Sequence, residues 1–187
     1  CGSDCGIDTV GLATATNLVR LNASDNPRIQ SVAPFAATLL ELDVGGLYSG
    51  IGDEALALAT NIVWLDCSGN RQITTMDPFG ASLRHLVAQQ LVASYDSSLC
   101  DAGLTSATNL VTLNCRFNSI ITSLAFCATS LQEVTAEGED CGVRGDEIAT
   151  MGPPLWKVWN DQITVQHLEG FYPVTASVFV RRRSVLS

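Results

Sequence analysis

The sequence predicts an α/β protein in which short parallel strands follow one another through a repeating unit, and two observations support this fold class. First, a tight pattern of Leu, Asn and Ile recurs three times, with copies that start at Leu18, Ile62 and Leu110. Second, a looser pattern lies between these copies, with starts at Leu39, Leu83 and Leu131. The unit is 21 to 27 residues long and alternates between two types, a period typical of chains in which each repeat supplies one strand and one return segment.

The tight copies share the pattern LxxLx(C/A)xxNxxI, and each of its positions has a physical explanation. Side chains alternate between the two faces of a strand, so one set of positions points into the stack and the residues between them point out. The inward pairs are Leu21 and Ala23, Leu65 and Cys67, and Leu113 and Cys115. We expect Asn26, Asn70 and Asn118, where the chain leaves each strand, to satisfy backbone groups of neighbouring turns.

The return segments differ between the two repeat types. After the looser repeats, an Asp precedes a short apolar run, and an Asp at that place is typical of a helix N-cap. These residues are Asp53, Asp101 and, in the outer copies, Asp8 and Asp146. After the tighter repeats, short segments that contain Pro34 and Phe35, Pro78 and Phe79, or Phe126 favour an extended or 3₁₀ path with the Phe in the core.

These repeats resemble the leucine-rich-repeat (LRR) family over about residues 7 to 152. Their short alternating units are similar to arrays in proteins of protists and of large DNA viruses. The resemblance implies a solenoid with a parallel β-sheet on the concave face and short helices or 3₁₀ turns on the convex side. We expect an array over residues 1–152, with an N-terminal helix or cap at about 1–17, and a degenerate repeat at 153–187 that acts as a C-terminal cap.

Composition excludes several classes of partner. The 19 acidic and 10 basic residues give a net charge of −9, which would repel nucleic acid and anionic membrane surfaces. No uninterrupted apolar run approaches the roughly 20 residues that span a bilayer, so we expect no membrane insertion. Free thiols in a reducing compartment fit the seven cysteines best, which favours an intracellular (cytoplasmic) protein over a secreted one; a Cys1–Cys5 disulfide is the alternative if the protein is secreted.

The sequence offers no constellation of catalytic or metal-binding residues. His85 and His167 lie far apart, and neither belongs to a metal-ligand or triad arrangement. The tripeptide Arg144-Gly145-Asp146 is in register with Gly52-Asp53, so its place in the repeat accounts for it. We therefore expect no enzyme activity, no cofactor and no metal.

The outward positions of the strands remain as the candidate site. An exposed Trp beside His and carboxylates is typical of a surface that binds a partner. The predicted protein-binding residues are Trp64, Asp43, Asp66, His85, Arg116 and Phe117.

The function that we expect is a protein–protein interaction module or adaptor that binds its partner on the concave face. The acidic excess predicts a partner with a basic patch. Two alternatives stay open: a structural component of a virion or cell surface, and the LRR part of a larger catalytic or F-box-type chain, for which a start at Cys1 instead of Met leaves room.

Overall fold

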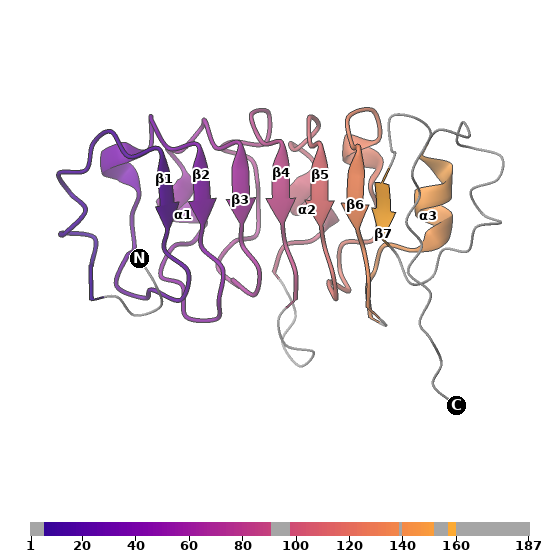
Figure 1. The fold of residues 1–187 in the computed structure, drawn as a ribbon, viewed down its shortest axis with the longest axis horizontal. Coiled ribbons are helices and arrows are strands. Elements are labelled where there is room, and N and C mark those ends of the chain that lie inside the picture. Colours follow the sequence, from indigo (N-terminus) through magenta and orange to yellow (C-terminus); the bar gives the residue numbers. More distant parts are fainter. Residues whose placement is uncertain (1–5, 91–97, 139, 152–156, 160–187) are drawn as a thin grey trace.

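One parallel β-sheet runs through the protein. The computed structural model describes residues 6–90, 98–138, 140–151 and 157–159. The sheet has seven strands in chain order: β1 (Arg20–Asn22), β2 (Glu41–Asp43), β3 (Trp64–Asp66), β4 (His85–Val87), β5 (Thr112–Asn114), β6 (Glu133–Thr135) and β7 (Lys157–Trp159). Figure 1 shows them side by side in a nearly straight row. The first six begin two residues after the predicted starts, so the predicted strands and their parallel pairing are confirmed.

The alternation of side chains explains why these short segments form strands. The central residue of each of the first six strands points into the core and is buried, from Leu21 to Val134. The residue two positions later is buried as well, and it is small or β-branched: Ala23, Val44, Cys67, Ala88, Cys115 and Ala136. The inward positions predicted from the sequence are thus confirmed.

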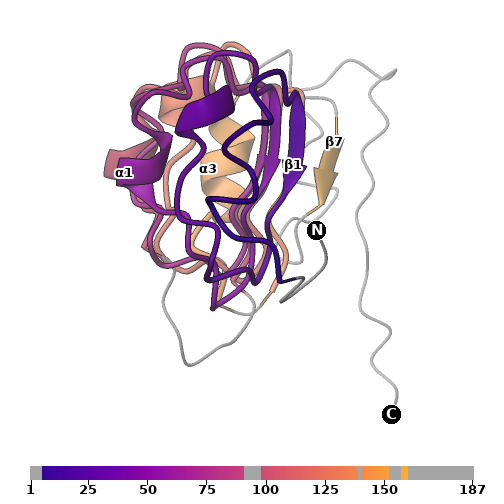
Figure 2. The same cartoon turned by 90° about the vertical axis from the view of Figure 1, so that its left-hand side faces the viewer.

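The return segments form the wall opposite the sheet, as Figure 2 shows along the row of strands. Short α-helices follow the looser repeats: α1 (Asp53–Leu56), α2 (Asp101–Leu104) and α3 (Gly145–Thr150). The 3₁₀ segments η1 (Ala33–Phe35) and η2 (Ala125–Cys127) follow the first and third tight repeats, and turns take their place after the second. The protein therefore has the α/β class that the sequence predicts.

The predicted N-cap role is wrong for Asp53, Asp101 and Asp146, the last because Arg144 holds the N-cap position of α3. Gly52 and Cys100 occupy the N-cap positions of α1 and α2, and Asp53 and Asp101 are the first residues within those helices. Their carboxylates instead accept hydrogen bonds from the next turn of the chain, Asp53 from the backbone N–H and hydroxyl of Thr74 and Asp101 from those of Thr122. A carboxylate shared between turns ties two repeats together, which a cap within one helix would not do.

Two further expectations about the returns need correction. The described part of the predicted N-terminal helix or cap, residues 6–17, forms successive turns, and Gly11 within it disfavours a helix. Asp8 makes the local contact of a cap, since its carboxylate accepts the Gly11 N–H at 2.8 Å. In the third tight return Cys127 takes the buried place of Phe35 and Phe79, while Phe126 is only partly buried. The cause is register, since Phe126 aligns with Pro34 and not with Phe35.

Polar side chains at the strand exits hold adjacent turns together. The buried amide of Asn70 donates to the carbonyls of Val44 and Ile51 at 2.8 and 3.0 Å and accepts the N–H of Gln72 at 2.9 Å. Asn118 makes the same kind of contacts, so the predicted structural role is confirmed for Asn70 and Asn118. The Asn26 amide donates to the Ser24 carbonyl of its own turn at 2.7 Å. On the return side, the hydroxyls of Thr38, Ser82 and Ser130 each lie within 2.8 Å of a carbonyl of the preceding turn.

The sheet continues beyond residue 152, because β7 pairs in parallel with β6 inside the range predicted as a degenerate repeat. The rest of the predicted C-terminal cap, residues 153–156 and 160–187, lies outside the described residues, as do Cys1 and Cys5. Among the described residues, no helix is long and apolar enough to cross a membrane.

Candidate functional site

The outward side chains of the strands form two rows on the surface that we call the sheet face. Strand register places Trp64 between Glu41 and His85 in the first row. In the second row, Asp43 lies directly beside Asp66. Four of the six predicted binding residues, Asp43, Trp64, Asp66 and His85, therefore lie together on β2, β3 and β4.

Trp64 is partly accessible, and this differs from the exposed indole expected from the sequence. His85 beside it is also half-buried, and its Nδ1 lies 2.9 Å from the hydroxyl of Thr112 on β5. A tethered imidazole and a partly packed indole lose little freedom when a partner covers them, which favours their use as contact residues.

Apolar side chains that sequence reasoning missed extend the surface around Trp64. Val19 and Leu40 are 43% and 39% exposed, and each stands just before the first outward residue of its strand. Val63 holds the same position before Trp64 and is half-buried. The signal was present in the repeat, because the position after the first Leu or Ile is apolar in four of the six copies, with Arg84 and Gln132 as the exceptions.

Asp43 and Asp66 shape the backbone as well as the charge of the sheet face. Their carboxylates accept the N–H groups of Gly45 and Ser68 at 3.0 and 2.9 Å, which fixes the turn at each strand exit. Asp43 also accepts the side-chain amide of Asn22 at 2.7 Å.

The charge of Asp43 is poorly compensated. Burial raises the pKa of Asp43 above its usual value, the Gly45 N–H lowers it, and the negative charges of Asp66 and Asp25 raise it further. Within the described residues, no Lys or Arg side chain forms an ion pair with Asp25, Asp43 or Asp66. A cation from a partner would relieve this repulsion.

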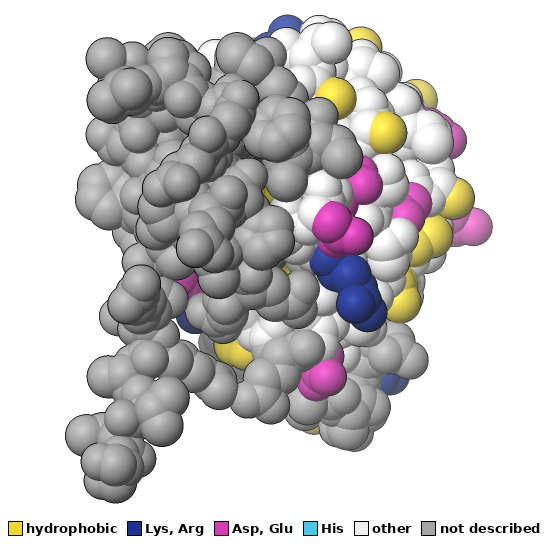
Figure 3. All heavy atoms as spheres, turned by 90° about the vertical axis from the view of Figure 1, so that its right-hand side faces the viewer, with side chains coloured by type: hydrophobic (Ala, Val, Ile, Leu, Met, Phe, Trp, Pro, Cys, Tyr) yellow, Lys and Arg dark blue, Asp and Glu magenta, His cyan; other side chains and the backbone are white. Residues whose placement is uncertain are grey.

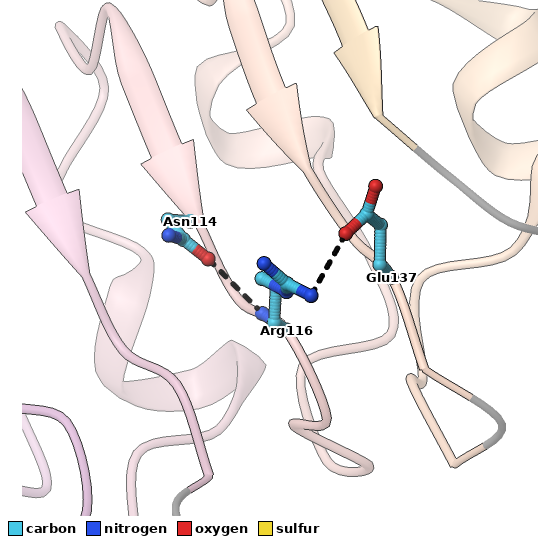
Figure 4. A network of polar contacts seen from close by, with 3 residues as sticks. All are labelled: Asn114, Arg116 and Glu137. Carbon is cyan, nitrogen blue, oxygen red and sulfur yellow. Dashed lines mark hydrogen bonds and ion pairs between the residues drawn. The ribbon is translucent and has the colours of Figure 1, made fainter. Parts of the chain in front are cut away.

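Arg116 and Phe117 form a second group, at the exit of β5. Figure 4 shows the Arg116 N–H directed at the Asn114 side chain and its guanidinium directed at Glu137 from the loop after β6. The ion pair spans 3.0 Å, and the Glu137 side chain is only 8% exposed. The guanidinium also lies 5.6 Å from the centre of the Phe117 ring.

Phe117 adopts a backbone conformation that bulky residues rarely take. Its φ is +58°, whereas glycines occupy the equivalent positions in other repeats at Gly46, Gly69 and Gly138, also with positive φ. Its ring lies against Gly138, where an added Cβ would clash with the ring, and Phe117 is still 45% exposed. Sequence reasoning found Phe117 but missed Glu137 and Gly138, whose roles depend on contact between turns.

The structure therefore divides the predicted footprint into two groups, one on β2 to β4 and one at the exits of β5 and β6. A different part of the surface gives a contrast: Figure 3 shows the C-terminal end, where the described atoms carry scattered acidic, basic and small apolar patches. Among the described residues, no group of three or more His, Cys, Asp or Glu side chains is arranged to hold a metal ion.

Comparison with known proteins adds no relative: no family model, no curated protein and no solved structure matches the chain.

Proposed function

We propose that this chain is a leucine-rich-repeat solenoid that binds a protein partner with a basic patch on its sheet face, without catalysis. The repeat pattern and the seven parallel strands in chain order support the solenoid. The observation that carries the function is the placement of a partly accessible Trp64 beside Asp43 and Asp66, whose charges have no basic partner among the described residues. Aromatic anchors next to charges that attract a partner are typical of protein interfaces.

Each group of side chains has a part in this binding. Trp64, with Val19, Leu40 and Val63 in the neighbouring row, supplies the apolar area that a partner would cover. The carboxylates steer the partner by long-range attraction and set the dependence of its affinity on salt. His85, Arg116 and Phe117 extend the contact area toward β5.

The free cysteines support a reducing, intracellular setting. Five described cysteines are not in disulfides in the structure: Cys67, Cys100, Cys115, Cys127 and Cys141. We propose that the protein works in the cytoplasm, where thiols stay reduced.

The test compares variants of the two walls of the molecule against one purified partner. A partner captured from source-cell extract is expressed alone, and its Kd is measured for wild type, Trp64→Ala and Glu54→Ala, with folding checked by circular dichroism. Trp64→Ala should weaken binding by about 2 kcal/mol, roughly 30-fold, because loss of an aromatic anchor costs that much. Glu54 is exposed on α1 in the opposite wall, so its variant should bind as wild type does.

The acidic part of the proposal has its own matched pair. Asp43→Asn with Asp66→Asn removes two charges but keeps an oxygen for the Gly45 and Ser68 N–H groups. Glu54→Gln with Asp77→Asn removes the same charge from the return segments. Only the first pair should slow association and flatten its salt dependence. Equal effects of both pairs, or a Glu54 variant that alone loses the partner, would refute a binding site on the sheet face.

A further inference from the structure

Three thiols gather in the core between the turns of β5 and β6. Cys115 follows β5 on the inward side, Cys127 ends η2, and Cys141 lies between β6 and α3. All three are buried, and none of them is in a disulfide in the structure. The proposed binding function uses none of them.

Two of these thiols are in direct contact. The Cys141 Sγ donates to the carbonyl oxygen of Cys115 at 3.5 Å, and the two side chains are also joined by a hydrogen bond between their thiols. Cys127 is directed elsewhere, because its Sγ donates to the Leu124 carbonyl at 3.5 Å within its own 3₁₀ segment. The contact therefore selects Cys115 and Cys141 as a pair.

We propose that Cys115 and Cys141 form a reversible disulfide that cross-links the turns of β5 and β6 when the protein meets a small-molecule disulfide such as oxidised glutathione. In the first step, the thiolate of one cysteine attacks a sulfur of oxidised glutathione and releases one glutathione thiolate. In the second step, the other cysteine attacks the mixed disulfide and releases the second. Two S–H bonds are lost and one S–S bond forms, while two electrons and two protons pass to glutathione, which leaves as two thiols.

Burial limits the reaction of Cys115 and Cys141 with disulfides. The hydrogen bond that the Cys115 thiol makes to Cys141 and then desolvation hold the pKa of Cys115 well above its usual value, so the thiolate is scarce while both side chains are buried. Cys141 is 6% exposed and follows the exposed Asp140, so it is the thiol that a local opening presents first. The cross-link then ties the loop of Phe117, which follows Cys115 by two residues, to the loop of Glu137, which precedes Cys141 by four residues.

The experiment uses the whole chain and does not need a binding partner. Reduced, unfolded protein is refolded in a mixture of reduced and oxidised glutathione, alkylated with iodoacetamide, digested without reductant and analysed by mass spectrometry. We expect a pair of peptides joined through Cys115 and Cys141, two hydrogens lighter than the reduced pair. The midpoint of thermal unfolding should rise by about 5 to 10 °C over that of reduced protein and return after dithiothreitol is added.

Matched variants separate the cross-link from a general effect of thiol loss. Cys115→Ala should fold, because Ala23 and Ala88 occupy the same inward position in other repeats, and it should lose the redox-dependent rise in melting temperature. Cys67→Ala, at the equivalent position after β3, should keep both the linked peptides and the rise. The proposal is overturned if wild-type Cys115 and Cys141 are recovered as alkylated thiols, or if Cys127 is joined to either of them.

Discussion

The backbone of Phe117 offers a stringent test of the structure, because its φ of +58° reverses the usual order of Ala and Gly. At most positions Ala is more stabilising than Gly, since Gly has more freedom to lose on folding. In the left-handed region a Cβ costs about 1 kcal/mol or more, and Gly carries no such cost. We therefore expect Phe117→Gly to be more stable than Phe117→Ala.

The magnitudes follow from the contacts of the ring. Full burial of a Phe side chain stabilises by about 1.5 to 3 kcal/mol, and Phe117 is 45% exposed, so loss of its ring costs about 1 to 1.5 kcal/mol. The contact with the Arg116 guanidinium adds about 0.5 kcal/mol. Phe117→Ala keeps the strained backbone and should lose about 2 kcal/mol of unfolding free energy. Phe117→Gly removes the strain and should lose only about 1 kcal/mol.

The assay is urea denaturation followed by circular dichroism. Variants are compared by the midpoints of their transitions, provided that the dependence of the unfolding free energy on urea concentration is the same for all of them. Glu54, exposed in α1, is the control position. There the unfolding free energy of Glu54→Ala should be about 1 kcal/mol higher than that of Glu54→Gly. If Ala is equal or superior to Gly at both positions, Phe117 does not adopt the left-handed conformation, and the case for a strained aromatic residue at this loop fails.

Three further predictions concern polar groups and thiols. Asn70→Ala should lower the unfolding free energy by about 3 kcal/mol or more, because it leaves two carbonyls and one N–H without their partner. The control Asn61→Ala, at an exposed residue with one bond to the Ala37 carbonyl, should lower it by about 1 kcal/mol. Similar midpoints of the two variants in urea would contradict this. Burial raises the pKa of Cys127 to about 12, so iodoacetamide at pH 8 should leave Cys127 unmodified in native protein while the half-buried Cys100 reacts. Equal alkylation rates at the two cysteines, measured by peptide mass spectrometry, would show that Cys127 is accessible. The pKa of Asp43 is raised in the folded protein, so ionisation of Asp43 opposes folding. As pH rises above about 4, wild type should therefore lose unfolding free energy relative to Asp43→Asn. A difference between the two proteins that is constant with pH would refute the shift.

Much of the fold could be predicted because the repeat records the inward positions directly. Leu21, Leu65 and Leu113 recur at fixed distance from Asn26, Asn70 and Asn118, and alternation within a strand then fixes which neighbours face outward. The inward thiols of Cys67 and Cys115 were expected for the same reason, and both are buried and free. Strand starts were predicted two residues early because the leading Leu or Ile of each copy packs before strand pairing begins.

Contacts between turns were harder to predict. Asp53 and Asp101 have the sequence context of helix caps. Their hydrogen bonds to Thr74 and Thr122 depend on how the next turn of the chain stacks on theirs, which the local sequence does not show. The same holds for the candidate site, where a linear pattern identified Arg116 but could not show that Glu137 would bind it from the adjacent loop. Residues on one strand follow from the period of the sequence, whereas partners across strands also depend on loop length.

Among the described residues, every strand pairs only with the strands next to it in the chain, so β1 and β7 at the two edges of the sheet do not pair with each other. The return segments alternate between two shapes, so the smallest piece that can be duplicated or deleted without mismatched neighbours is a pair of turns, as from β3 to β5. Growth by such pairs would lengthen the face while leaving each existing turn with the same two neighbours. The reach of this surface can therefore be altered by recombination within the gene, in steps of one pair, without redesign of the interior.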